Sequence, residues 1–210
     1  MSPDRRAAQR GGSGSPGPGR ERVLALVLGA ASGGLYWASI PKPDLGLLAW
    51  VCLIPLLVAV CHLRQACGLL AAFVAGVVSG LGRTYWIAST LQVYGYVPRG
   101  FALFTGALLI AYLATYWVFH AAVCRALPRR SLLFAWLVAA AWVLQEWVQT
   151  WMLSGFPWEL LGYSQHRFLP VLQLASVTGI FGLSFLVSLV NAGLYQAVAG
   201  GLSGRRAVVA

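Results

Sequence analysis

The chain has 210 residues, of which 59% are hydrophobic and 10% are charged, and its formal net charge is +10. A soluble domain carries about 25% charged residues, so this composition excludes an ordinary soluble domain and indicates a multispanning helical membrane protein. The positive charge does not indicate a nucleic-acid-binding protein, because the basic residues lie between apolar stretches and do not gather on one exposed face.

The predicted fold class is all-α, a polytopic helical membrane bundle of about six transmembrane helices, because each crossing needs about 20 mostly apolar residues. The chain contains a suitable stretch for each of them. The expected spans are Val23 to Ile40, Leu45 to Cys61, Cys67 to Trp86, Phe101 to Cys124, Leu132 to Leu153 and Ile180 to Ala199.

Residues 1–22 are rich in glycine, serine, proline and arginine and cannot bury a core, which predicts a disordered basic cytoplasmic tail. Residues 23–210 are predicted to form one transmembrane helical domain. If the N-terminus lies in the cytoplasm, most basic residues fall on the same side, and the positive-inside rule then places both visible ends there. The basic residues on the other side are Lys42, Arg83, Arg99 and Arg167.

The first two spans are joined by Pro41–Asp44, a turn-forming cluster that predicts a hairpin corner. The third span ends in aromatic residues, including Tyr85 and Trp86, that are typical of the outer membrane boundary. Arg83 is less ordinary, because it lies within the span. Small residues in the same span predict close approach of a neighbouring helix, and they are Gly68, Gly76, Ser79, Gly80 and Gly82.

The fifth span contains Glu146, the only acidic residue inside a predicted span. An ionisable group at that depth is costly and is a functional-site candidate. It is equally suited to form an intramembrane ion pair with Arg83, which lies at similar depth. The two interpretations overlap, because such a pair can shape a site for a lipid headgroup, and both stay open.

The segment after the fifth span combines rigidity with polar groups. Proline fixes its own backbone and favours extended geometry in the preceding residue, so Phe156–Glu159 predicts a rigid turn. Membrane anchoring accounts for Trp158 and Tyr163. The polar residues around them indicate a further role, with a polar ligand or a soluble domain resting on this surface, and they are Glu159, Ser164, Gln165 and His166.

Beyond this segment, a short interfacial helix is expected from about Pro170 to Ser176, and Gly179 with Gly182 is expected to break the helix that follows. The cytoplasmic turn Arg125–Arg130 shows no evident chemistry.

Catalytic and metal-binding patterns are weak throughout the chain. Apart from Glu159, Ser164 and His166 lack a persuasive third member of a triad, and residues two apart do not face each other on a helix. The histidines fall on both membrane sides, which does not favour a metal site, and no cofactor is expected. The cysteines are interpreted as small packing residues, and they are Cys52, Cys61, Cys67 and Cys124.

Four segments together resemble the membrane half of bacterial apolipoprotein N-acyltransferase. They read GLLAWVCLIPLLVAV, GLGRTYWIASTLQVYG, WVLQEWVQTWMLSGFPWELLGYSQ and LPVLQLASVTGIFGLSFLVSLVNAGL, in that order. The resemblance covers about residues 23 to 200, and its most specific elements are GFPW and LGYSQ.

The resemblance implies a multi-pass enzyme of the bacterial inner membrane that transfers an acyl chain from a phospholipid to the diacylglyceryl-cysteine of an apolipoprotein. It implies that a periplasmic nitrilase-like domain performs this chemistry with a Glu-Lys-Cys triad and a thioester intermediate. No such triad can be assigned here, because Lys42 is the only lysine and no cysteine lies in a soluble segment. The chain alone is therefore expected to be inactive.

The expected partners are the phospholipid acyl donor, the diacylglyceryl apolipoprotein and membrane lipids, and not nucleic acid. The expected role is to hold lipid substrates and to dock the catalytic domain, whether the chain is a fragment or a natural short protein. The alternative is a catalytically inert anchor or partner for a separately encoded lipid-using enzyme, such as a polyprenyl-linked glycosyltransferase. Candidate residues for the lipid entry are Tyr85, Trp86, Glu146, Trp147, Phe156, Pro157, Trp158, Glu159, Tyr163, Ser164 and Gln165.

Overall fold

The computed structural model describes residues 17–158 and 160–208, and this part of the chain contains helices and no strands. The predicted all-α fold class is confirmed. In chain order the elements are α1 (Pro18–Ser39), the 3-10 turn η2 (Gly46–Trp50), α2 (Ile54–His62), α3 (Gln65–Val93), α4 (Arg99–Ala126), α5 (Phe134–Gln149), the 3-10 turns η3 (Met152–Ser154) and η4 (Leu161–Gln165), α6 (Leu169–Leu172) and α7 (Ala175–Val208).

Among the residues that the structure describes, three helices are long and apolar enough to cross a membrane, judged by length and composition. They are α3, α4 and the Ala175–Ala199 part of α7. The other predicted spans fall on α1, on the shorter apolar stretch Gly46–His62, and on α5 with its 16 residues. A count of about six spans therefore stays a prediction.

Helix α1 begins at Pro18, five residues before the predicted start at Val23. Proline is favoured in the first turn of a helix, where its missing N–H costs nothing, and the arginines and glutamate that follow are good helix formers. Residues 1–16 of the predicted tail lie outside the described residues.

The predicted second span is not one helix. Its first half forms η2 and its second half forms α2, which carries Pro55 in its first turn. Proline cannot donate to the preceding turn, so the helix starts anew there. The predicted break near Gly179 is confirmed, since Gly179 has φ 66° inside α7. The short helix expected near Pro170 is α6.

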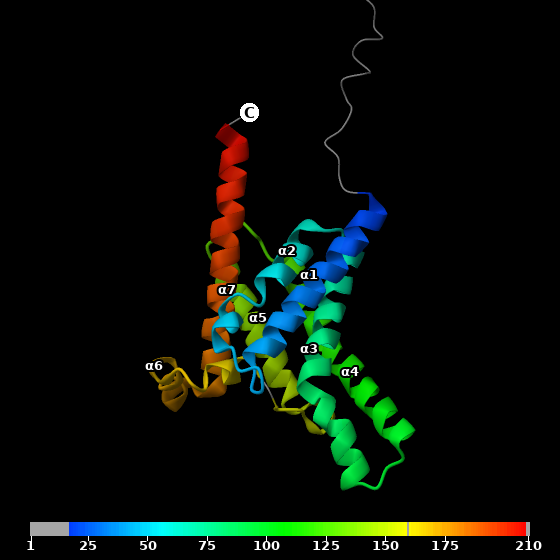
Figure 1. The fold of residues 1–210 in the computed structure, drawn as a ribbon. Coiled ribbons are helices and arrows are strands. Elements are labelled where there is room, and N and C mark those ends of the chain that lie inside the picture. Colours follow the sequence, from blue (N-terminus) through cyan, green and yellow to red (C-terminus); the bar gives the residue numbers. More distant parts are fainter. Residues whose placement is uncertain (1–16, 159, 209–210) are drawn as a thin grey trace, which may run out of the picture.

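Small residues bring α1, α3 and α4 into close contact (Figure 1). A Cβ atom built on Gly33 of α1 would lie 2.4 Å from the backbone oxygen of Ala75 in α3. A Cβ atom on Gly76 would lie 2.6 Å from Cα of Ala114 in α4. The predicted close helix approach along the third span is therefore present, and any side chain at these glycines would separate the helices.

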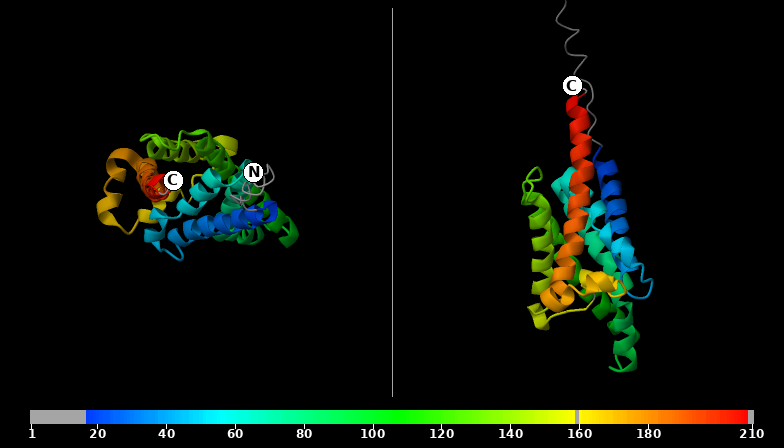
Figure 2. Two further views of the ribbon diagram at one scale, coloured as in Figure 1. Left: turned by 90° about the horizontal axis from the view of Figure 1, so that it is seen from above. Right: turned by 90° about the vertical axis from the view of Figure 1, so that its left-hand side faces the viewer.

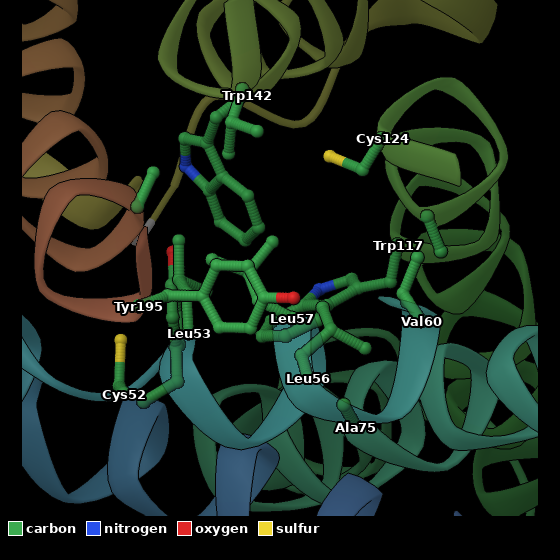
Figure 3. Packing of buried hydrophobic residues seen from close by; sticks show 14 of the residues in the cluster. Cys52, Leu53, Leu56, Leu57, Val60, Ala75, Trp117, Cys124, Trp142 and Tyr195 are labelled. Atoms are coloured by element: carbon green, nitrogen blue, oxygen red, sulfur yellow. The ribbon is translucent and has the colours of Figure 1, made fainter. Parts of the chain in front are cut away.

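The core joins α1, α2, α4, α5 and α7 around aromatic rings (Figure 3). Trp142 of α5 is 1% exposed and meets Trp117 of α4 edge to face, with ring centroids 5.1 Å apart. His120 packs on the same indole at 4.9 Å. Trp142, the first residue of the segment WVLQEWVQTWMLSGFPWELLGYSQ, is thus a core residue.

The end of α4 and the turn that follows it have a structural role that sequence analysis does not identify. Arg125 donates from Nη1 to the carbonyl oxygens of Val60 and Leu63, at 2.8 and 3.0 Å. Arg129 donates to the carbonyl of Cys61. Because the last carbonyls of a helix lack intrahelical partners, these two arginines cap the C-terminal end of α2.

The two ends of the described chain lie at the same end of the bundle. Figure 1 shows the start of α1 and the end of α7 at one end of the bundle and the segment from η3 to α6 toward the other end. The right-hand view of Figure 2 shows the same arrangement. This arrangement fits the orientation predicted from the basic residues, with the chain ends inside and the segment after α5 outside. The assignment of the two ends to membrane sides stays a prediction.

All four cysteines are expected to resist thiol labelling in the folded protein. Each is buried, with at most 8% of the residue exposed. A maleimide added to the native protein should leave them unmodified, and the same reagent should modify all four after denaturation, as mass spectrometry would record. Rapid labelling of Cys52 or Cys124 in the native protein would contradict the packing described here.

Candidate functional site

The centre of the candidate site is a carboxylate that fastens the returning chain to α5. Glu146 lies in the last turns of α5 and is 2% exposed. Its Oε1 accepts hydrogen bonds from Nε1 of Trp142, at 2.9 Å, and from the backbone N–H of Leu161, at 2.8 Å. Leu161 opens η4, so Glu146 binds a backbone donor that has no partner within its own turn.

The same turn is held from its other side by α7. The backbone N–H of Gly162 donates to Oγ of Ser184 at 2.9 Å, and Ser184 also lies beside the Glu146 carboxyl group. A Cβ atom on Gly162 would come within 2.6 Å of the carbonyl oxygen of Ile180. Glycine is therefore required for this contact, and η4 lies between α5 and α7.

The path from α5 to η4 is a tight return with unusual backbone geometry. Leu153, Ser154 and Gly155 all have positive φ, at 51°, 75° and 78°. Two hydrogen bonds between Gln149 and Phe156 close the return. The backbone N–H of Phe156 donates to the carbonyl of Gln149 at 2.7 Å, and the side-chain Nε2 of Gln149 donates to the carbonyl of Phe156 at 2.9 Å. Non-glycine residues adopt such φ values at a cost, which the paired ends of the loop offset.

Gln165, at the end of η4, connects this turn to η2. Its Oε1 accepts from Nε1 of Trp50 at 3.1 Å, and its Nε2 donates to the carbonyl of Gly46 at 3.0 Å. Ser164 donates from Oγ to the carbonyl of Leu161 at 2.6 Å. Both side chains are nearly fully buried, so their polar groups act within the fold.

Asn191 of α7 supports the break between η2 and α2. Its Oδ1 accepts from the N–H of Leu53, and its Nδ2 donates to the carbonyl of Ala49, both at 2.8 Å. Ser32 of α1 donates to the carbonyl of Cys52 at 2.7 Å. Irregular backbone inside a membrane protein needs internal partners of this kind, so these side chains make the break tolerable.

An ion-paired cluster lies at the end of the bundle opposite the chain ends. Asp44, in the turn after α1, pairs with Arg167 and lies 3.5 Å from Nε2 of His166. Asp44 lies just before η2, and His166 and Arg167 lie just after η4. The contacts among them therefore strengthen the contact between these two turns, the η2–η4 junction. His166, a member of the predicted polar cluster, thus has Asp44 of the same chain as a partner.

The structure divides the sequence-predicted candidates into two groups. The buried members are Glu146, Phe156, Ser164 and Gln165, and each has a contact inside the fold described above or in the cluster around Tyr116. Glu159 lies outside the described residues. The exposed members are Tyr85, Trp86, Trp147, Pro157, Trp158 and Tyr163.

Two of the exposed aromatic residues share a hollow. Trp158 and Tyr163, which are 52% and 41% exposed, line a cavity of about 260 Å³ together with Ile40, Pro41 and His166. Trp147 packs on Trp151 instead, with ring centroids 5.5 Å apart. The hollow therefore joins the turn after α1 to the segment before α6, and aromatic rings form much of its lining.

Arg83 is buried in α3, and its guanidinium lies over the ring of Tyr36 at 4.9 Å from the centroid. Such a contact between a cation and an aromatic face is favourable. Glu146, in turn, has the two hydrogen bonds described above. A direct pair between Arg83 and Glu146 stays a prediction.

Sequence analysis does not identify Asn191 or Ser184. Both are polar residues within the predicted last span. Amide side chains in membrane helices commonly form hydrogen bonds to neighbouring helices, so the sequence does indicate an interhelical role for Asn191. The indication is weaker for Ser184, because serine is also a common small packing residue in membrane helices. Together these side chains fix an irregular backbone at the end of the bundle opposite the chain ends, and aromatic rings lie beside it.

Comparisons with known proteins identify the family of this chain. The family model "Apolipoprotein N-acyltransferase N-terminal domain" matches residues 32–193. The apolipoprotein N-acyltransferase of Geobacter metallireducens is 33% identical over 183 residues, which are 87% of this chain and 34% of that protein. That of Chromobacterium violaceum is 35% identical over 196 residues, 88% of this chain and 36% of that protein.

A more distant relative, the apolipoprotein N-acyltransferase of Rickettsia bellii, is 27% identical over 185 residues. The chain spans about a third of the length of the curated relatives it matches. The matched region contains the Glu146 contacts, both 3-10 turns of the η2–η4 junction and Asn191. The chain therefore belongs to the apolipoprotein N-acyltransferase N-terminal domain family.

Proposed function

We propose that this chain is the membrane part of an apolipoprotein N-acyltransferase, and that it holds the lipid substrates beneath a catalytic domain. The acyl donor would be a phospholipid and the acceptor a diacylglyceryl apolipoprotein, in the bacterial inner membrane. The proposal is supported by the family match and by one structural observation. Exposed rings of Trp158 and Tyr163 lie on a segment whose backbone is fixed by buried side chains.

This geometry suits a platform for lipids. Tryptophan and tyrosine place an apolar ring against acyl chains and a polar tip among headgroups. A surface that orients lipids needs a fixed backbone. The hydrogen bonds that η4 makes to Glu146 and Ser184 hold the backbone of η4 in place. The chain's residues would thus bind and orient lipid, which lowers the entropic cost of the reaction.

The covalent chemistry is proposed to lie in the nitrilase-like domain implied by the resemblance. A thioester intermediate needs an accessible thiolate, and the four cysteines of this chain are buried. With a labelled phospholipid donor, the 210-residue chain should form no thioester. Labelling of any of its cysteines would overturn this part of the proposal.

A chimeric enzyme tests the platform directly. The matched region of the Geobacter metallireducens relative would be replaced by the matched part of this chain, and N-acylation of a diacylglyceryl-cysteine peptide would be measured with a phospholipid donor. We expect the chimera to be active. Trp158→Ala combined with Tyr163→Ala should lower its rate roughly tenfold, since each aromatic contact contributes about 0.5–1.5 kcal/mol.

Trp136→Ala is the matched control, because Trp136 is 55% exposed, similar to the 52% of Trp158, but lies at the start of α5. The control should keep the parental rate. An inactive chimera that is folded and inserted would contradict the proposed role of the chain. An active chimera in which the double substitution has no effect would contradict the platform.

A further inference from the structure

Helix α4 contacts the return from α5 to η4. Tyr112, in the middle of α4, donates from its hydroxyl to the carbonyl of Met152 at 3.3 Å. Met152 opens η3, and the backbone N–H of Gly155 donates to the same carbonyl at 3.0 Å. The residues between them are Leu153 and Ser154, both with positive φ. Tyr112 therefore bonds to the carbonyl that closes this part of the loop, 40 residues away in the sequence.

Tyr116, one helical turn further along α4, supports Tyr112. The two hydroxyl groups form a hydrogen bond, and the two rings meet edge to face with centroids 5.3 Å apart. A tyrosine hydroxyl has one hydrogen to donate. Because Tyr112 donates its hydrogen to Met152, Tyr116 is the donor to Tyr112. The two hydroxyls therefore form a directed series of hydrogen bonds that ends on the loop.

Tyr116 also packs on the other end of the same loop. Phe156, which is 8% exposed, forms one apolar cluster with Tyr116 and Leu113 of α4. Phe156 closes the return through its two hydrogen bonds to Gln149. Helix α4 thus holds the loop at both ends, by a hydrogen bond at Met152 and by apolar packing at Phe156.

The ring of Trp158 packs on the ring of Phe156. The two ring centroids are 5.0 Å apart and the ring planes make an angle of 62°, which is a favourable edge-to-face geometry. Pro157 between them has a fixed φ, so a displacement of Phe156 is passed on to Trp158 over a short and stiff segment. Trp158 also lines the cavity of about 260 Å³, which leaves the ring space to turn. The orientation of Trp158 therefore depends on the position of Phe156.

We propose that Tyr112 and Tyr116 are positioning residues, which set the orientation of the Trp158 ring through the loop and Phe156. This inference rests on the proposed function, in which Trp158 contacts lipid; the two tyrosines themselves act only through other residues. Tyr112→Phe removes the bond to Met152 and leaves the buried Tyr116 hydroxyl without its acceptor, whereas Tyr116→Phe removes one donor only. Because an orphaned buried donor is costly, the first substitution should have the larger effect.

Fluorine NMR of the 210-residue chain, labelled with fluorotryptophan in detergent micelles, tests this proposal. The chain has nine tryptophans, and a Trp158→Phe variant identifies the Trp158 resonance by its loss. We expect Tyr112→Phe to shift or broaden the Trp158 resonance, and Tyr116→Phe to do so less. The resonance of Trp136, at the start of α5, should stay unchanged in both variants.

Tyr195→Phe is the matched control. Tyr195 is 4% exposed, close to the 7% of Tyr116, but its hydroxyl bonds to Nε2 of His62 at 3.2 Å. This control removes an equally buried hydroxyl from another part of the bundle and should leave the Trp158 resonance in place. An unchanged Trp158 resonance in folded Tyr112→Phe, or an equal change in Tyr195→Phe, would overturn the proposal. If Tyr112→Phe does not fold, Tyr116→Phe is judged by the same criteria.

The chimeric enzyme separates this inference from the proposed function. Tyr112→Phe should lower its acylation rate, but by less than the roughly tenfold loss expected when both platform rings are removed. A variant that moves the Trp158 resonance and keeps the full acylation rate would support the positioning role and contradict the platform. A lowered rate with an unmoved Trp158 resonance would overturn the positioning role.

Discussion

Glu146→Ala is expected to lower the free energy of unfolding by about 3 kcal/mol, because it leaves two buried donors without an acceptor and each costs about 1–3 kcal/mol. These donors are Nε1 of Trp142 and the N–H of Leu161. Glu146→Gln keeps an oxygen in the same position and should cost less than half as much. Denaturant unfolding in bicelles, followed by tryptophan fluorescence, measures both variants.

The comparison of the two variants separates hydrogen bonding from charge. Equal losses for alanine and glutamine would contradict the acceptor role and would favour the proposed pair with Arg83. In that case Arg83→Gln combined with Glu146→Gln decides the question. Partial recovery in the double variant supports the pair, whereas strictly additive losses count against it.

Asn191→Leu is expected to destabilise the protein by about 3 kcal/mol, because a side chain of similar size replaces the amide. The substitution leaves the N–H of Leu53 without its acceptor and the carbonyl of Ala49 with only the weak Cys52 thiol donor. The effect should concentrate at the η2–α2 break, where hydrogen exchange of the Leu53 amide should accelerate. Thermal unfolding in detergent gives the overall loss, and exchange mass spectrometry gives its location.

Gln196→Leu provides the matched control for Asn191. Gln196 also lies in α7 and also donates to two carbonyls, those of Arg129 and Ser131, but at a less buried turn. Water can replace these bonds, so the loss should stay under about 1 kcal/mol. Asn191→Leu as stable as this control would show that the break does not depend on the amide.

The general architecture is predictable because hydrophobic stretches of membrane length are a strong signal. The break near Gly179 and the short helix after Phe168 are predictable as well, since glycine and proline mark them. The split of the second predicted span into η2 and α2 is not among the predictions, although Pro55 indicates it. Proline in the first turn of α2 separates that helix from η2.

The importance of Glu146 is visible in the sequence because buried acidic groups in membrane spans are rare. The sequence does not indicate that the backbone N–H of Leu161 is its hydrogen-bond partner. Leu161 lies 15 residues away, and the two meet only because Leu153 and Ser154 adopt positive φ values. No local preference predicts that conformation for these residues, so the contact depends on tertiary structure.

Which side chains of η4 are buried also depends on tertiary structure. The sequence places Tyr163, Ser164 and Gln165 together as candidate surface residues, yet the structure exposes Tyr163 and buries the other two. Side-chain direction in a short 3-10 turn depends on what packs against it. Here Gln165 bonds to the carbonyl of Gly46 in η2, Ser164 bonds back to the carbonyl of Leu161 within η4, and the ring of Tyr163 remains outside.

We propose that η4 forms a fixed surface at the outer side of the membrane. Single substitutions Tyr163→Cys and Ser164→Cys test it, since the native cysteines are buried. A membrane-impermeant maleimide added outside spheroplasts should label Tyr163→Cys rapidly and should leave Ser164→Cys unlabelled until the protein is denatured. Labelling of Tyr163→Cys only from the cytoplasmic side, or equal labelling of the two neighbours, would contradict the account.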